Sequence, residues 1–87
     1  MTTISNITIS TDGTKPPADI EVTVTCTVTN ANGKTPQAFF PAQSMGKPMT
    51  NTSGNTWTAS DRQMYDDGDK TLKIVCNGAE ASQQFKP

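Results

Sequence analysis

The fold is decided by a ten-residue stretch of strict alternation, Ile20-Glu21-Val22-Thr23-Val24-Thr25-Cys26-Thr27-Val28-Thr29. Its even-numbered positions are apolar or cysteine, and its odd-numbered positions are polar. Because successive side chains on a β-strand point to opposite faces, the stretch predicts a strand with one buried face. The same parity recurs in Leu72-Lys73-Ile74-Val75-Cys76, which predicts a second strand of this kind.

Each of these strands carries one cysteine on its expected buried face, Cys26 in the first and Cys76 in the second. Two such strands, far apart in the chain, predict two facing sheets around one core, as in an immunoglobulin-like sandwich. The pair favours a Cys26–Cys76 disulfide, which would close a loop of about fifty residues and stabilise the fold by roughly 4 kcal/mol in the chain-entropy model. Reduced, buried thiols are the alternative, because cytosolic thiols stay reduced.

Turn residues divide the rest of the chain into short strands at even spacing, which is typical of an all-β sandwich. Further strands are expected at about 4–10, at about 37–40, around Trp57 and Ala59, and from Ala79 to Phe85 after the Asn77-Gly78 hairpin signal. Only one of Phe39 and Phe40 can face the core. Prolines predict an irregular edge over 41–49, the segment 51–55 is expected to be a turn, and a helix at 62–65 would be one turn at most.

These elements make a single antiparallel two-sheet domain, residues 1–87, with about seven strands. Its predicted core consists of the inward-facing residues Val22, Val24, Val28, Trp57, Leu72 and Ile74.

Composition excludes several classes of function. The net charge is −1, and the seven Lys and Arg residues are scattered along the chain, whereas nucleic-acid binding requires clustered basic residues. No apolar run is long enough to span a membrane. The chain has no histidine, so Ser-His-Asp and Cys-His catalysis and His-held zinc are excluded. We therefore expect a non-enzymatic protein with no catalytic residues, no cofactor and no metal.

Two acidic groups could suggest otherwise. Asp66, Asp67 and Asp69 offer carboxylates to calcium but lack the spacing of an EF-hand loop, and turn residues of this kind are expected between strands. Asp61 and Glu80 could be imagined as a general acid and base, yet nothing in the sequence indicates that they meet.

Two short motifs in the second half of the chain point to a family. Gly54-Asn55-Thr56-Trp57-Thr58 matches a Gly-x-x-Trp-x pattern, and Asp67-Gly68-Asp69-Lys70-Thr71-Leu72-Lys73-Ile74 follows an Asp-Gly-x-Tyr-Thr-Leu-x-Val pattern with Lys70 in place of Tyr. Both patterns belong to bacterial and phage immunoglobulin-like domains, which this part of the chain resembles. The tyrosine expected two residues before the second cysteine of antibody domains is replaced by Ile74, which argues against an animal immune receptor.

The resemblance, the initial Met and the missing signal peptide together suggest a phage protein made in the host cytoplasm and located in the virion. We expect a capsid decoration protein whose partner is the major capsid protein or another virion protein, with host-surface glycans as a further partner. The expected docking segments are 1–6 and 41–49, with the candidate residues Met1, Ile4, Phe39, Met45 and Met49. The alternative is a carbohydrate- or receptor-binding module of a bacterial adhesin or extracellular enzyme.

Overall fold

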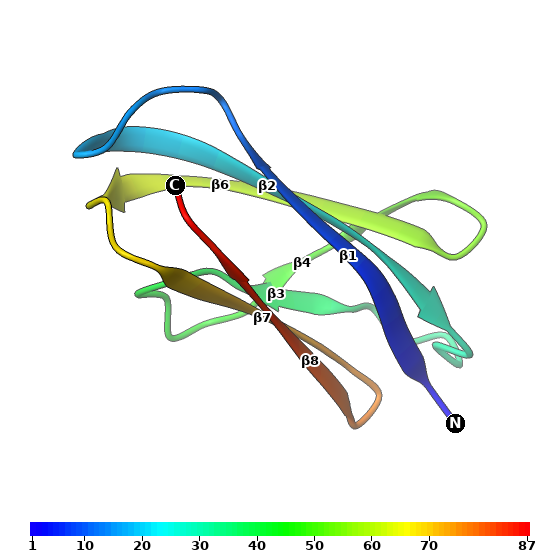
Figure 1. Ribbon diagram of the computed structural model, residues 1–87. Coiled ribbons are helices and arrows are strands. Elements are labelled where there is room, and N and C mark those ends of the chain that lie inside the picture. Colours follow the sequence, from blue (N-terminus) through cyan, green and yellow to red (C-terminus); the bar gives the residue numbers. More distant parts are fainter.

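The computed structural model describes residues 1–87 as an all-β sandwich of two antiparallel, four-stranded sheets (Figure 1). Its strands are β1 (Thr3–Thr11), β2 (Ala18–Thr29), β3 (Gln37–Phe39), β4 (Lys47–Pro48), β5 (Thr50–Ser53), β6 (Thr56–Tyr65), β7 (Lys70–Cys76) and β8 (Ala79–Phe85). Sheet A has the order β1-β2-β6-β5, and sheet B has the order β4-β3-β7-β8. These are the ABED and CFG sheets of the immunoglobulin fold with the short β4 added, so the predicted sandwich is confirmed.

The core forms where β2 of sheet A faces β7 of sheet B. Every even-numbered residue of β2 from Ile20 to Val28 is at most 1% exposed, and Leu72 and Ile74 on β7 are fully buried. Five of the six predicted core residues are therefore in the core. Trp57 is the exception, because it lies near the start of β6 opposite Cys26 and is only partly buried against the core.

A bulge in β1 brings Ile4 into the core, contrary to its expected role in docking. Ser5 pairs with Thr27 and Thr8 pairs with Thr25, so β1 contains one residue more than β2 between these two pairs. The extra residue is accommodated at Asn6, whose φ is 53°. The bulge reverses the alternation, and Ile4 therefore faces the core together with Ile7 and Ile9.

The structure corrects two further expectations. Part of the turn expected at 51–55 is the edge strand β5, whereas residues 62–65, where at most one helical turn was allowed, continue β6. Met49 is only 4% exposed and belongs to the core, so it is not a surface docking residue. Of the two adjacent phenylalanines, Phe40 is buried and Phe39 is partly exposed, as the strand geometry required.

The loops gather at the two ends of the sandwich (Figure 1). The N-terminus, the loop after β2 and the β7–β8 turn lie at one end, which we call the N-terminal end. The loops 12–17, 40–46 and 66–69 lie toward the other end. The Asn77-Gly78 hairpin turn forms as predicted, with positive φ at both residues, which matches the type I′ turn.

Candidate functional site

The surface of the sandwich carries three features that could serve binding: a charged cluster on sheet A, the loop 40–46 beside sheet B, and a hollow at the N-terminal end.

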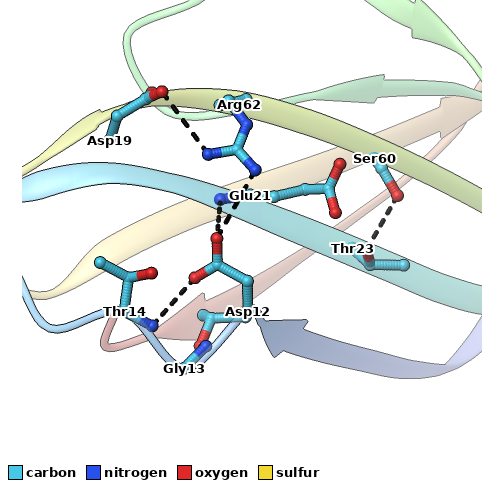
Figure 2. Close-up of polar contacts among 9 residues, drawn as sticks. Asp12, Gly13, Thr14, Asp19, Glu21, Thr23, Ser60 and Arg62 are labelled. Carbon is cyan, nitrogen blue, oxygen red and sulfur yellow. Dashed lines mark hydrogen bonds and ion pairs between the residues drawn. The ribbon is translucent and has the colours of Figure 1, made fainter.

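The charged cluster lies where the loop 12–17 meets sheet A. Figure 2 shows Arg62 of β6 reaching across β2 between Asp12 and Asp19, at 3.7 Å and 3.5 Å from their carboxylates. Asp12 also accepts hydrogen bonds from the backbone N–H of Thr14 (2.9 Å) and of Glu21 (3.2 Å). These contacts, with the Thr14 N–H as the largest cause, lower the pKa of Asp12. Its acceptors are engaged in closing the loop, so the cluster acts as a structural anchor for the first loop.

The loop 40–46 is held against both sheets. Asp61 of β6 lies on the core-facing side of its strand, opposite Val22, at a position left uncovered by the short β5. It accepts a hydrogen bond from Gln43 Nε2 at 3.1 Å and lies 3.8 Å from Lys47 Nζ, which also donates to the Ser60 carbonyl. Contacts with β6 of sheet A therefore hold the loop at its middle, through Gln43, and at the start of β4, through Lys47.

The same loop covers one of the predicted docking residues. Phe39 points away from the core, and Lys73 Nζ lies 5.1 Å from the centre of its ring. A Cβ at Gly46 would come within 2.9 Å of Phe39 Cζ, so the backbone of the loop rests directly on the ring. Phe39 thus supports the loop, and Met45, which precedes Gly46, is left 80% exposed.

The predicted docking residues are consequently not brought together. Met1 is fully exposed at the N-terminal end, and Met45 is exposed on the loop 40–46, toward the opposite end. Ile4 and Met49 are part of the core or packed against it.

The hollow at the N-terminal end has a volume of about 460 Å³. Three segments line it: the N-terminus, the loop after β2 and the β7–β8 turn, which contribute Met1, Thr2, Asn32, Asn77, Gly78 and Ala79. A hydrogen-bonded chain fixes its wall, since Asn77 Nδ2 donates to Thr2 Oγ1 at 2.9 Å and Thr2 Oγ1 donates to the Asn30 carbonyl at 2.7 Å. Sequence reasoning read these asparagines only as turn residues; their clustering in the turns was the one available signal.

The acidic residues singled out from the sequence are engaged separately. Asp61 pairs with Lys47 on one side of the sandwich, and Glu80 lies 3.7 Å from Lys73 on the outer face of sheet B. In the 66–69 turn, Asp66 accepts hydrogen bonds from Lys70 Nζ and from the Gly68 N–H. The bond from Lys70, the larger cause, and that from Gly68 lower the pKa of Asp66. No group of three or more His, Cys, Asp or Glu residues is placed to hold a metal ion.

The expected Cys26–Cys76 disulfide is not formed in the structure. Both residues are free, buried thiols. Each sulfur has its own neighbour: Cys26 Sγ lies 4.0 Å from Met49 Sδ, and Cys76 Sγ lies 3.9 Å from the Lys34 carbonyl oxygen. Burial raises the pKa of Cys26 to about 11, with a further contribution from Cys76, and burial also raises the pKa of Cys76. At neutral pH both groups are therefore protonated.

We expect both thiols to resist modification in the folded protein. Thiolate is the reactive form, and burial both suppresses it and blocks access, so labelling by a disulfide reagent at pH 8 should be slow. Adding denaturant without reductant should expose two reactive thiols per chain. Finding no thiol in the denatured, unreduced protein would show that the bridge forms after all.

Comparison with known proteins adds no relative: no family model matches the chain, and neither a curated protein nor a solved structure does so. The assignment of the immunoglobulin-like fold therefore rests on the strand order of the two sheets. The structure contains no helix with the length and apolarity needed to cross a lipid bilayer.

Proposed function

We propose that this chain is a non-enzymatic phage virion protein that decorates the capsid, docking on the shell by one end of the sandwich and displaying the other. The observation that carries the proposal is the separation of two exposed apolar positions, Met45 on the loop 40–46 and Met1 at the N-terminal end. A display module on a shell needs two separate ends, because the partner occupies one end and the other end must remain exposed.

The loop 40–46 is the better docking surface of the two. It is held to sheet A through Gln43 and Lys47 and rests on the Phe39 ring, so little conformational freedom is lost when a partner covers it. The loop carries the exposed Met45, a flexible apolar side chain of the kind that adapts to a partner surface. The partner that fits this role is the major capsid protein or another structural protein of the particle.

Docking by this loop would leave the N-terminal end facing the medium. Many copies on one shell would make even a weak affinity for host-surface groups effective, because linked sites bind with high avidity. The displayed end is therefore where host contact is expected.

Density-gradient sedimentation of the native source, with mass spectrometry of each fraction, tests the proposal. The chain should band with particles at a constant ratio after repeated banding. Recovery only as a free 9.3 kDa species at the top of the gradient would overturn decoration and favour a binding module of a bacterial adhesin.

A variant pair tests the docking surface on particles that lack the chain. Met45→Glu should abolish re-addition of the purified protein, because a charge would be buried at the contact. Met64→Glu, at another exposed methionine on β6, should bind like the unaltered protein. Equal binding of both variants would remove the loop 40–46 from the contact.

A further inference from the structure

We propose that the outer edge of β8 pairs with β8 of a second copy of this chain, which joins the two B sheets into one continuous sheet. The inference goes beyond the proposed function and does not depend on it. β8 is the last strand of sheet B, and within the chain it pairs only with β7 (Figure 1). Its other side is therefore an open strand edge.

Backbone groups along this edge have few partners within the chain. The N–H and C=O groups of an antiparallel strand point to alternate sides, so part of those in β8 point away from β7. None of the backbone hydrogen bonds formed outside the ladders involves β8, and only the Gln84 carbonyl accepts one from a side chain, that of Gln83 at 3.2 Å. β1 of the facing sheet contacts β8 but pairs with β2. The edge is thus a template for a further strand.

The other three sheet edges carry features that discourage strand pairing. β1 contains the bulge at Asn6, and β5 has four residues with an irregular register. β4 has two residues and ends in Pro48. Short, bulged or proline-containing edges are the means by which proteins prevent contacts between sheet edges. β8 has none of these features, because its seven residues pair with β7 without a shift and include neither Gly nor Pro.

The sequence of β8 is complementary to itself in the antiparallel direction. Its positions on the outer face of sheet B are Glu80, Ser82 and Gln84, and the same alternation reaches Lys86 just beyond the strand. In a pairing centred on Gln83, each Glu80 lies opposite the second copy's Lys86. Ser82 then lies opposite Gln84, so two polar side chains meet. Directly opposite pairs of unlike charge stabilise a sheet, and the twofold symmetry supplies two of them.

The same register fits the face of β8 that points into the sandwich. It places Ala81 opposite the second copy's Phe85, a small residue against an aromatic ring. Gln83, at the centre, lies on the same face as its β7 partner Leu72 but is exposed, whereas Leu72 is fully buried. The chain itself therefore leaves this face of β8 uncovered at its middle, where the second copy would lie.

A second copy is the occupant that these features favour. Two strands related by a twofold axis perpendicular to the sheet run antiparallel, which is the direction in which the charges match. Such a contact closes as a dimer and does not propagate. A net charge of −1 for each chain produces little repulsion between the copies. β8 and β4 lie at opposite edges of sheet B, so the dimer leaves the loop 40–46 free to dock.

Analytical ultracentrifugation of the full chain, together with amide hydrogen exchange, tests the inference. The mass should rise from one chain toward two over about 0.01–1 mM, the weak affinity expected of an interface below about 1,200 Å². Over the same range, amides at alternate positions of β8 should become protected from exchange. A single 9.3 kDa species at every concentration would overturn the inference. A dimer that leaves the β8 amides unprotected would overturn it as well, because its contact would lie elsewhere.

Charge-reversal variants test the register. Glu80→Lys and Lys86→Glu should each weaken self-association about 10-fold, because each sets two pairs of like charges opposite one another. An equimolar mixture of the two variants should associate again, since every opposed pair in the mixed dimer has unlike charges. Glu21→Lys, the same reversal at an exposed position of the inner strand β2, should associate like the unaltered chain.

The two variants also control for effects within one chain. Glu80 lies 3.7 Å from Lys73 of β7, so Glu80→Lys removes this ion pair as well, whereas Lys86→Glu leaves it intact. Equal weakening by both variants therefore points to the contact between copies. A mixture that associates no better than either variant alone would disprove the pairing of Glu80 with Lys86. Association of both variants at the unaltered affinity would remove β8 from the contact.

Discussion

Replacing Ile74 with alanine is expected to lower the free energy of unfolding by about 2–5 kcal/mol. Ile74 is fully buried on β7, an inner strand of sheet B, where it lies between Ala38 of β3 and Ala81 of β8. Both of these neighbours are already small, so they cannot fill the space that a second alanine would leave. A domain of this size has a total stability of about 5–15 kcal/mol, and the variant would therefore populate unfolded chains measurably.

The adjacent Val75→Ala is the matched control. Val75 follows Ile74 on the same strand but points to the outer face of sheet B and is only partly buried. Its truncation should cost less than about 1 kcal/mol, because only the strand preference of a β-branched residue is lost. Denaturant unfolding, followed by fluorescence of the single tryptophan Trp57, measures both variants.

Similar losses for the two variants would contradict the face assigned to β7. Should Ile74→Ala fail to fold, Ile74→Val serves in its place, with an expected loss of about 0.5–1.5 kcal/mol.

The alternating pattern predicts the difference between Ile74 and Val75. It can be recognised in the sequence because it depends only on neighbouring residues of one strand. Each of Val22, Val24 and Leu72 is placed by the two-residue period of its own strand, so sequence alone predicted its burial correctly. Ile4 was misplaced because its burial depends on a bulge at Asn6, and an asparagine at that position reads equally well as an exposed strand residue. The two-residue period of a strand does not show where a bulge inserts one extra residue and reverses the alternation.

The candidate site was less predictable, because it depends on contacts between distant segments. Met49 is buried because the chain turns back at β4 and places its sulfur against Cys26, a contact that no local pattern encodes. The hollow likewise joins Thr2, Asn32 and Asn77, which lie far apart in sequence and meet only when the two sheets close. The sequence thus predicts which face of a strand is buried, whereas the topology determines which loop residues come together at the ends of the sandwich.

Raising the pH from 9 to 12 is expected to remove at most about 5 kcal/mol of stability, because buried groups, chiefly Cys26 and Tyr65, stay protonated in the folded state. Burial raises the pKa of Cys26 from 9.0 to about 11. Burial, together with the charge of Asp61, raises the pKa of Tyr65 from 10.0 to about 12. Between these values the folded protein binds more protons than the unfolded chain, so stability falls as pH rises.

The two contributions occupy overlapping pH ranges. That of Cys26 is complete below about pH 9 and lost by about pH 11, and that of Tyr65 is complete below about pH 10 and lost by about pH 12. A shift of two pKa units corresponds to at most about 3 kcal/mol for each group, and solvent screening lowers this value. Denaturant unfolding at a series of pH values measures the sum.

Tyr65→Phe isolates the contribution of the tyrosine. The Tyr65 hydroxyl is buried without a hydrogen-bond partner, so at neutral pH its removal should leave stability unchanged or raise it by about 1 kcal/mol. The edge-to-face contact with the Phe85 ring, with centres 6.1 Å apart, is available to phenylalanine as well. The variant should lose the decline between pH 10 and 12 and keep the decline that Cys26 produces between pH 9 and 11.

Because Tyr65 is the only tyrosine, tyrosinate absorbance reports its ionisation directly in the folded and the unfolded chain. Ionisation near pH 10 in the folded protein would show that the Tyr65 ring is open to solvent. The packing at the end of β6 would then be looser than the 3% exposure of Tyr65 indicates. Ionisation only as the fold is lost would tie the alkaline limit of the domain to this one buried hydroxyl.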